Sequence, residues 1–102
     1  MLTPDDEIQI LVAPERLVAD SRLEFRRAAI EHLERVVQRS ATRVLVDMRH
    51  TTEIDASGLG VLVLLQKRAR ERMLATRLLC APPAVKQMLA LTKLDHLFEM
   101  EG

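Results

Sequence analysis

The feature that most constrains the fold of this chain is the alternation of short apolar runs with longer segments of helical periodicity. Residues 43–48 (RVLVDM) form a compact apolar run with β-branched side chains, which predicts a buried strand. Residues 76–81 (TRLLCA) form a second short apolar run. Strands that alternate with helices are typical of an α/β fold with a largely parallel sheet.

The length and composition of the chain limit its class. A chain of 102 residues, 48% of them hydrophobic, suits one domain over residues 1–102 with a core that needs no disulfide. Its 15 basic and 15 acidic side chains cancel, which argues against a general nucleic-acid binder. The single cysteine, Cys80, fits a reducing compartment. The longest apolar run, residues 59–65, is far shorter than the roughly 18 residues of a membrane span. We therefore expect a cytoplasmic protein without nucleic-acid binding or membrane insertion.

The clearest helix pattern begins after Ser21. Ser21 and Glu24 have the spacing of a capping box and predict a helix from about Arg22 to Arg39. His32 falls on the side of the arginines and is expected to be solvated. Apolar side chains recur at intervals of three, four or seven and predict the buried face of the helix: Leu23, Ala29, Ile30, Leu33, Val36 and Val37.

Weaker patterns lie before and after these elements. Residues 7–12 alternate, with Ile8, Ile10 and Val12 on one side, and predict a strand, while residues 15–18 are expected to form a short partner strand. Residues 97–100 predict an edge strand. The chain is thus expected to form a mixed, largely parallel sheet of about 4–5 strands packed with about 3–4 helices. A last helix is expected to begin at Pro82 and Pro83 and to bury Val85, Met88, Leu89 and Leu91.

The segment between the two apolar runs has the least ordinary pattern. Residues 54–60 read Ile-Asp-Ala-Ser-Gly-Leu-Gly, and the run VLVLL that follows fits a buried strand or a buried helix. Asp55 and Ser57 suit the N-terminus of a helix, and the cations of residues 67–72 suit its C-terminus. These flanks predict a helix from about Ser57 to Arg72. A helix that is apolar almost all round is either covered on two sides or presents a surface to a partner.

The loop at residues 54–60, between a strand and an apolar helix, resembles the signature loop of STAS domains, the anti-sigma-factor antagonists of bacteria and their relatives. The ending APPAVKQMLALTKLDHLFEM is similar to the last strand, helix and strand of that family. The resemblance covers residues 8–100 and implies a STAS-type α/β fold.

The resemblance implies a function in protein–protein recognition and in signal transduction to transcription, without enzymatic activity, cofactor or metal. In the antagonists, the unphosphorylated domain binds an anti-sigma factor, often itself a serine kinase, and phosphorylation of the loop breaks that complex. A phosphate adds about two negative charges, which is enough to disrupt a packed interface. The partner-binding loop that the resemblance assigns to this chain consists of Asp55, Ala56, Ser57, Gly58, Leu59 and Gly60.

Two alternative functions stay open at this point. One is an accessory subunit of a lipid-transport ABC system, in which a STAS domain clamps the ATPase. The other is a phospho-accepting signalling protein that uses Ser57. Self-association is compatible with each of these functions.

The chain departs from the family pattern at one position. The phosphoacceptor of the antagonists directly follows the loop aspartate, and here that residue is Ala56. Ser57, one position further, is open to two interpretations: a displaced phosphosite, or a helix cap that contributes roughly 1 kcal/mol. We favour the cap and expect that the usual kinase does not switch this protein off.

Gly58 and Gly60 have two compatible interpretations. A glycine lets the backbone of a partner approach closely, and it also lets the helix pack close to the sheet, although glycine in a helix interior is unfavourable. Asp55 is expected to cap the helix through its carboxylate.

Other candidate sites lack the residues that their chemistry needs. Asp47 ends a buried strand, but the acidic pair and the lysine of a phosphorylated receiver domain are missing, so it is expected to bond a loop N–H group. The three histidines have no metal-ligand spacing. Cys80 is expected to be a small core residue, and the cations of residues 67–72 to be a solvated helix end.

Overall fold

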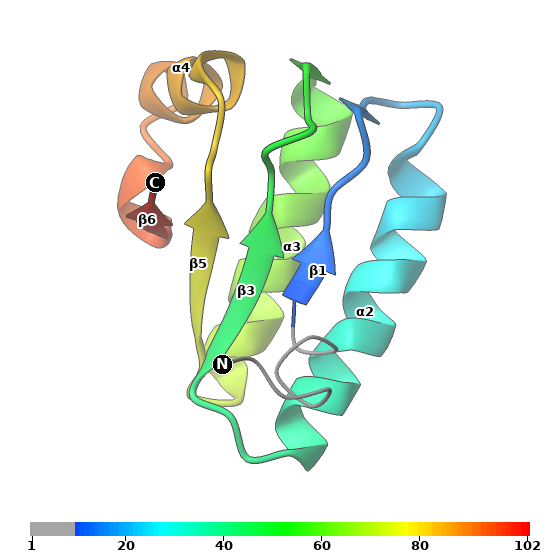
Figure 1. The fold of residues 1–102 in the computed structure, drawn as a ribbon, viewed down its shortest axis with the longest axis vertical. Helices are drawn as coiled ribbons and strands as arrows, with labels where there is room; N and C mark the ends of the chain where they lie inside the picture. Colours follow the sequence, from blue (N-terminus) through cyan, green and yellow to red (C-terminus); the bar gives the residue numbers. More distant parts are fainter. Residues whose placement is uncertain (1–9) are drawn as a thin grey trace.

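The computed structural model describes residues 10–102, and its centre is a four-stranded sheet (Figure 1). The strand order is β1 (Ile10–Val12), β3 (Arg43–Asp47), β5 (Ala75–Leu79) and β6 (Glu99–Glu101), and each neighbouring pair is parallel. Two further short strands, β2 (Arg16–Leu17) and β4 (Glu53–Ile54), pair in parallel beside it. The predicted α/β fold with a largely parallel sheet is confirmed.

Helices α2 (Arg22–Gln38) and α3 (Ala56–Glu71) run along one face of this sheet, and α4 (Pro83–Leu91) lies at the end where β4 is found (Figure 1). A short 3-10 helix, η1 (Asp95–Leu97), connects α4 to the edge strand β6. Within residues 10–102, no helix combines the length and the apolar content needed to cross a membrane.

The core fills the layer between the sheet and the two long helices. Alternate residues of the strands point into it, because neighbouring side chains of a strand lie on opposite faces. Val44 and Val46 of β3 and Leu78 of β5 are fully buried there. From the helices, the core takes Phe25, Ala29, Leu33 and Val36 of α2, Leu62, Leu65 and Ala69 of α3, and Val85 and Leu89 of α4.

The predicted strand at the amino end is only partly described, because residues 7–9 lie outside the described range. In β1 the predicted side is wrong: Leu11 is buried, and Val12 is 58% exposed. Leu11 lies opposite Val46 in the register and therefore shares its helix-covered face. The expected partnership of residues 15–18 is also wrong, because β2 pairs with β4, with Arg16 opposite Glu53.

The start of α2 also differs from the prediction. Ser21 is the N-cap residue, but its side chain makes no capping hydrogen bond. Its hydroxyl donates to the Arg16 carbonyl at 2.6 Å and accepts from the Val18 N–H at 3.1 Å. The capping box is therefore wrong, since the hydroxyl closes the turn before the helix instead.

The buried face of α2 is shifted relative to the predicted one. Leu23 is 66% exposed, whereas Phe25 and His32 are buried. The expectation of a solvated His32 is wrong, because the sheet and α3 both pack on α2 and together cover a wider arc than one apolar stripe.

Two predictions near the carboxyl end are also wrong. Cys80 is exposed, because it follows the last residue of β5 with a φ of 54° and thereby leaves the alternation of the strand. Leu91 is 75% exposed at the end of α4. The prolines do begin this helix, with Pro83 in its first turn, and the predicted edge strand is confirmed as β6.

Candidate functional site

The candidate site is built around the first turn of α3, which follows directly on β4. Asp55 is the N-cap residue, with an extended backbone, and its carboxylate accepts a hydrogen bond from the Gly58 N–H at 2.9 Å. The other carboxylate oxygen accepts from the Ala19 N–H at 3.1 Å. The predicted capping role of Asp55 is confirmed. This one side chain joins the start of α3 to the segment that precedes α2.

Ser57 is not the cap of this helix. The helix begins at Ala56, so Ser57 is already its second residue, and the capping acceptor is the carboxylate two residues earlier. The structural interpretation of Ser57 is therefore wrong. Its hydroxyl lies half-buried on the outer side of the first turn.

The hydrogen bonds lower the pKa of Asp55 below its ordinary value of 3.8. The main cause is the Gly58 N–H, and the Ala19 N–H acts in the same direction, while desolvation acts against both. The ionised form is thus favoured at the positive end of the helix dipole. The cap is a carboxylate anion at neutral pH.

The two glycines of the loop have different environments. A Cβ atom on Gly58 would lie 1.9 Å from the Leu17 carbonyl oxygen, so only glycine permits α3 to start this close to β2. A Cβ atom on Gly60 would meet no atom of the described residues within 4 Å, apart from its chain neighbours and the backbone of its own helix. Packing within the chain therefore explains Gly58 and leaves Gly60 unexplained.

The six residues predicted as a partner-binding loop divide by direction. Gly58 and Leu59 face the core, with Leu59 packed in the main hydrophobic cluster. Ala56 and Gly60 are exposed and Ser57 is half-buried. Of the six loop residues, these three and the half-buried Asp55 form the surface that another molecule can touch.

A shallow groove of about 340 Å³ opens beside these three residues, between the starts of α2 and α3. Its other side is formed by Arg22, Leu23 and Arg26. This wall was not predicted from the sequence, because the periodicity of α2 placed Leu23 on its buried face. The local signal of its exposure was its place in the first turn of the helix between two charged residues, Arg22 and Glu24.

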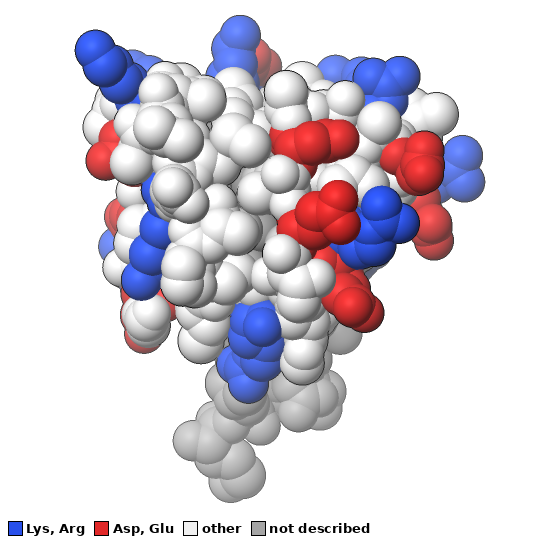
Figure 2. Space-filling view, turned by 90° about the horizontal axis from the view of Figure 1, so that it is seen from above, with Lys and Arg blue, Asp and Glu red and all other residues white. Residues whose placement is uncertain are grey.

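Figure 2 looks down on the end of the molecule that holds β4 and α4, and it shows acidic side chains gathered beside a wide uncharged area. The connecting segments around β2 and β4 supply exposed carboxylates in Glu15, Asp20 and Glu53. Glu53 pairs with Arg16 at 3.1 Å. The outward residues at the start of α3 carry no charge themselves, so a docking surface there consists of small, uncharged residues.

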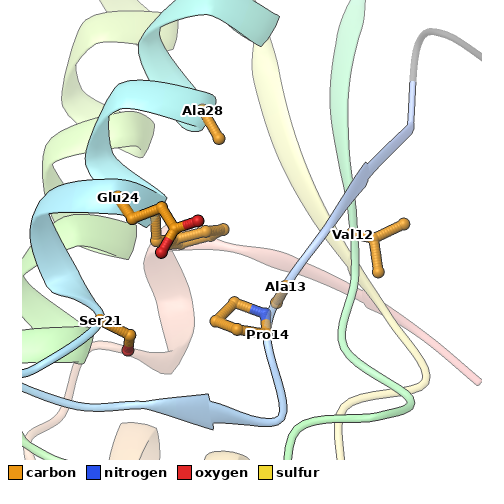
Figure 3. Close-up of a pocket in the computed structure, with 7 residues that line it drawn as sticks. Val12, Ala13, Pro14, Ser21, Glu24 and Ala28 are labelled. Carbon is orange, nitrogen blue, oxygen red and sulfur yellow. The ribbon is translucent and has the colours of Figure 1, made fainter.

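A second depression, of about 290 Å³, lies between the end of β1 and the first turns of α2 (Figure 3). Ala13 and Pro14 line one side of it and Glu24 and Ala28 the other; the Pro14 ring points toward α2, whereas the side chain of Val12 points away from that helix. It contains none of the residues predicted for the loop. The Ser21 hydroxyl on its wall is already used by the backbone of the preceding turn.

The remaining candidate residues have structural surroundings. The carboxylate of Asp47 accepts a hydrogen bond from the Arg49 N–H at 3.0 Å, as predicted for a residue at the end of a strand. In the part of the chain that the structure describes, no group of three or more His, Cys, Asp or Glu residues could hold a metal ion. The cations at the end of α3 are exposed: Lys67, Arg68, Arg70 and Arg72.

Comparisons with known proteins agree on the fold. The family model of the STAS domain matches residues 14–101. Among solved structures, a proposed anti-sigma factor antagonist from Thermotoga maritima superposes with a TM-score of 0.77 at 17% identity, covering 100% of this chain and 83% of that one. The NMR structure of the same Thermotoga protein gives a TM-score of 0.72 at 19% identity, with coverages of 98% and 76%.

A third similar structure comes from a different class of protein. A sulfate transporter family protein from Wolinella succinogenes has a TM-score of 0.73 at 13% identity, covering 99% of this chain and 80% of that one. A search of the curated proteins found no match. At these identities the structural likeness establishes the fold alone.

Proposed function

The chain belongs to the STAS domain family, and on that basis we propose that it is a non-enzymatic recognition module that docks on an anti-sigma factor or a related serine kinase. The proposed docking surface is the outward side of the Asp55–Gly60 loop and of the helix that follows. Binding would release the sigma factor that the partner holds. The supporting neighbour is the proposed antagonist from Thermotoga maritima, which shares this fold.

The observation that carries the proposal is the exposed glycine at position 60. Glycine inside a helix is about 1 kcal/mol less favourable than alanine, and among residues 10–102, apart from the adjacent residues and the backbone of its own helix, nothing lies within 4 Å of a Cβ placed there. The fold therefore pays a penalty at Gly60 without any gain in its own packing. A partner whose backbone approaches the first turns of α3 would supply the gain.

Ala56 gives the proposal its regulatory side. The resemblance places the phosphoacceptor at this position, and Ala56 is exposed but has no hydroxyl. The neighbouring Ser57 is half-buried in the first turn of the helix. We therefore propose a module that binds its partner without being released by the usual phosphorylation.

The test of the docking surface is the variant Ala56→Asp. A carboxylate in the first turn of α3 interacts favourably with the helix dipole by about 0.3–1 kcal/mol, so the melting temperature should stay close to that of the parent. In a docked complex the same carboxylate would be withdrawn from water at a contact built for a small uncharged side chain, and desolvation of a charge costs several kcal/mol. Each 1.4 kcal/mol is a tenfold loss of affinity, so we expect binding at least about a hundredfold weaker in calorimetry.

A matched control is Ala84→Asp. Ala84 is also an exposed alanine in the first turn of a helix, here α4, so the substitution adds the same charge to the same kind of site. It should bind like the parent. An Ala56→Asp protein that is folded and binds with unchanged affinity would place the docking surface elsewhere. Equal losses in both variants would also contradict docking through the loop.

Phosphorylation is tested separately. The protein is incubated with ATP and with a kinase partner captured from cell lysate, and its intact mass is then measured. We expect no stoichiometric gain of phosphate in the parent and a gain of one phosphate in Ala56→Ser. A parent protein that gains one phosphate, and loses this gain in Ser57→Ala, would instead support the phospho-accepting alternative at Ser57.

The identity of the partner distinguishes the antagonist role from the remaining alternative function. A pull-down that recovers a soluble kinase-like protein supports the antagonist role, whereas recovery of a membrane ATPase supports an accessory subunit of a lipid transporter. The proposal places the protein in the cytoplasm. The exposed thiol of Cys80 is compatible with such a reducing compartment.

A further inference from the structure

We infer that the groove between α2 and α3 binds an acidic amphipathic helix of the partner. This inference rests on the proposed function, because the groove begins at Ala56, Ser57 and Gly60. It adds the chemistry of the partner, which neither the family nor the loop specifies.

The groove consists of two open depressions that adjoin at Leu64, and the narrow space between α2 and α3 that links them has no room for a water molecule. Leu64 lines both open depressions and the narrow space between them. This space shares Arg26 with the near depression and Arg68 with the far one. The far depression has a volume of about 440 Å³ and reaches Arg72 near the end of α3. With 16 residues in α3, the groove is about 24 Å long, which matches a helix of four to five turns at about 1.5 Å per residue.

The floor of the groove is apolar and remains accessible. Leu23 is 66% exposed, and Ile30 and Leu64 are half-buried. The small residues Ala56 and Gly60 leave the near end open. Apolar side chains spaced along one face of a helix would fit between these positions, as in other complexes where a helix lies in a groove.

The rim of the groove is basic although the whole chain is neutral. Its lining residues include five cations, Arg22, Arg26, Lys67, Arg68 and Arg72, and two carboxylates, Glu34 and Glu71. Both carboxylates line the far depression, where Arg72 lies 3.9 Å from Glu34, and the charged residues that line the near depression are Arg22 and Arg26. A complementary partner carries acidic side chains beside its apolar face.

Charge also argues against a second copy of this chain in the groove. In a two-fold dimer the same surface meets itself, so the arginines of one groove would face those of the other. An acidic helix removes this repulsion. The uncharged floor argues equally against a purely ionic ligand, which would leave Leu23 exposed to water.

The first experiment titrates the full chain with a synthetic helix of about 16 residues, in which leucines recur at spacings of three and four and glutamates flank them. Chemical shifts in NMR should change at Leu23, Gly60 and Leu64. A peptide of the same composition in scrambled order, and one with lysine in place of glutamate, should each bind at least about tenfold more weakly. Equal binding of the scrambled peptide would reduce the interaction to charge alone and overturn the inference.

The second experiment reverses the charge of the rim. The double variant Arg26→Glu, Arg68→Glu should weaken binding of the acidic helix at least about tenfold. Its matched control is Arg27→Glu, Arg70→Glu, because these arginines are exposed on the same two helices but do not line the groove. If the reversed pair does not fold, Arg26→Gln with Arg68→Gln keeps the helix propensity and removes the charge. Equal losses in variant and control would overturn the inference.

The natural partner separates this inference from the proposed function. A captured partner that loses affinity for Ala56→Asp but binds the Arg26 and Arg68 variant normally would leave the proposed function standing and overturn the groove. A partner that is indifferent to both would contradict the proposed function, and the peptide titration would still decide the groove. Concentration-dependent dimers of the parent that disappear in the Arg26 and Arg68 variant would place a second copy in the groove and overturn the inference.

Discussion

The same substitution, glycine to alanine, should have opposite effects at two positions only two residues apart. In Gly58→Ala the new methyl group would lie 1.9 Å from the Leu17 carbonyl oxygen and 2.7 Å from the carbonyl carbon. These are backbone atoms, so no side-chain rotation can relieve the overlap. The start of α3 must instead move away from β2, which also strains the hydrogen bond from the Asp55 N–H to the Leu17 carbonyl, now 3.2 Å long.

The magnitude follows from two opposing effects. Forcing an extra methyl group into a packed site costs about 1–3 kcal/mol, and alanine returns up to about 1 kcal/mol through its better helix propensity. Because the obstacle at Gly58 is backbone, we expect the upper part of that range and a net loss of about 1–2 kcal/mol. At Gly60 only the propensity remains, so Gly60→Ala should gain about 0.5–1 kcal/mol.

The assay is urea unfolding of the parent and both variants, supported by thermal melts. A change of 1 kcal/mol corresponds to roughly 4–8 °C in the melting temperature of a domain of this size. Gly58→Ala should therefore melt well below the parent and Gly60→Ala several degrees above it. A Gly58→Ala variant as stable as the parent or more stable would refute the close approach of α3 to β2, and a destabilised Gly60→Ala variant would refute the open space at that position.

Two further predictions concern single side chains. The pKa of Asp55 is lowered in the folded state, so the unfolded chain binds the extra proton first as the pH falls, and the stability that the carboxylate supplies above about pH 3.8 is lost as the pH falls through its folded pKa. Urea unfolding between about pH 6 and pH 2.5 should therefore show a steeper loss of stability in the parent than in Asp55→Asn. Parallel curves would contradict this prediction. Cys80 is exposed, so its thiol should react with a thiol reagent in the native protein at a rate that urea raises only slightly, whereas protection until global unfolding would show that it is a core residue.

Local patterns in the sequence predicted helices α2, α3 and α4 and the four strands of the main sheet, whereas β4 was not predicted. The polarity of the charges around the run VLVLL predicted helix α3, and Asp55 was recognised as its cap, because capping and dipole interactions act over a single turn. The proline pair likewise predicted the start of α4. The loop motif singled out residues 54–60 as the candidate docking surface, and this role stays a prediction.

Which side each residue faces was decided only by the tertiary structure. His32 is buried and Leu23 exposed because α2 is covered by both the sheet and α3, and periodicity within one helix does not report the direction of two neighbours. The Ser21 hydroxyl serves the turn before α2 because that turn brings the Arg16 carbonyl within reach.

The same distinction separates the two glycines. In the sequence Gly58 and Gly60 have the same motif and the same two interpretations. In the fold the Leu17 carbonyl lies against Gly58, because β2 pairs with β4 and lies against the first turn of α3. Gly60 faces open space. The sequence motif contains both glycines, but only the contact between segments some forty residues apart shows that the packing of the fold requires Gly58 and does not require Gly60.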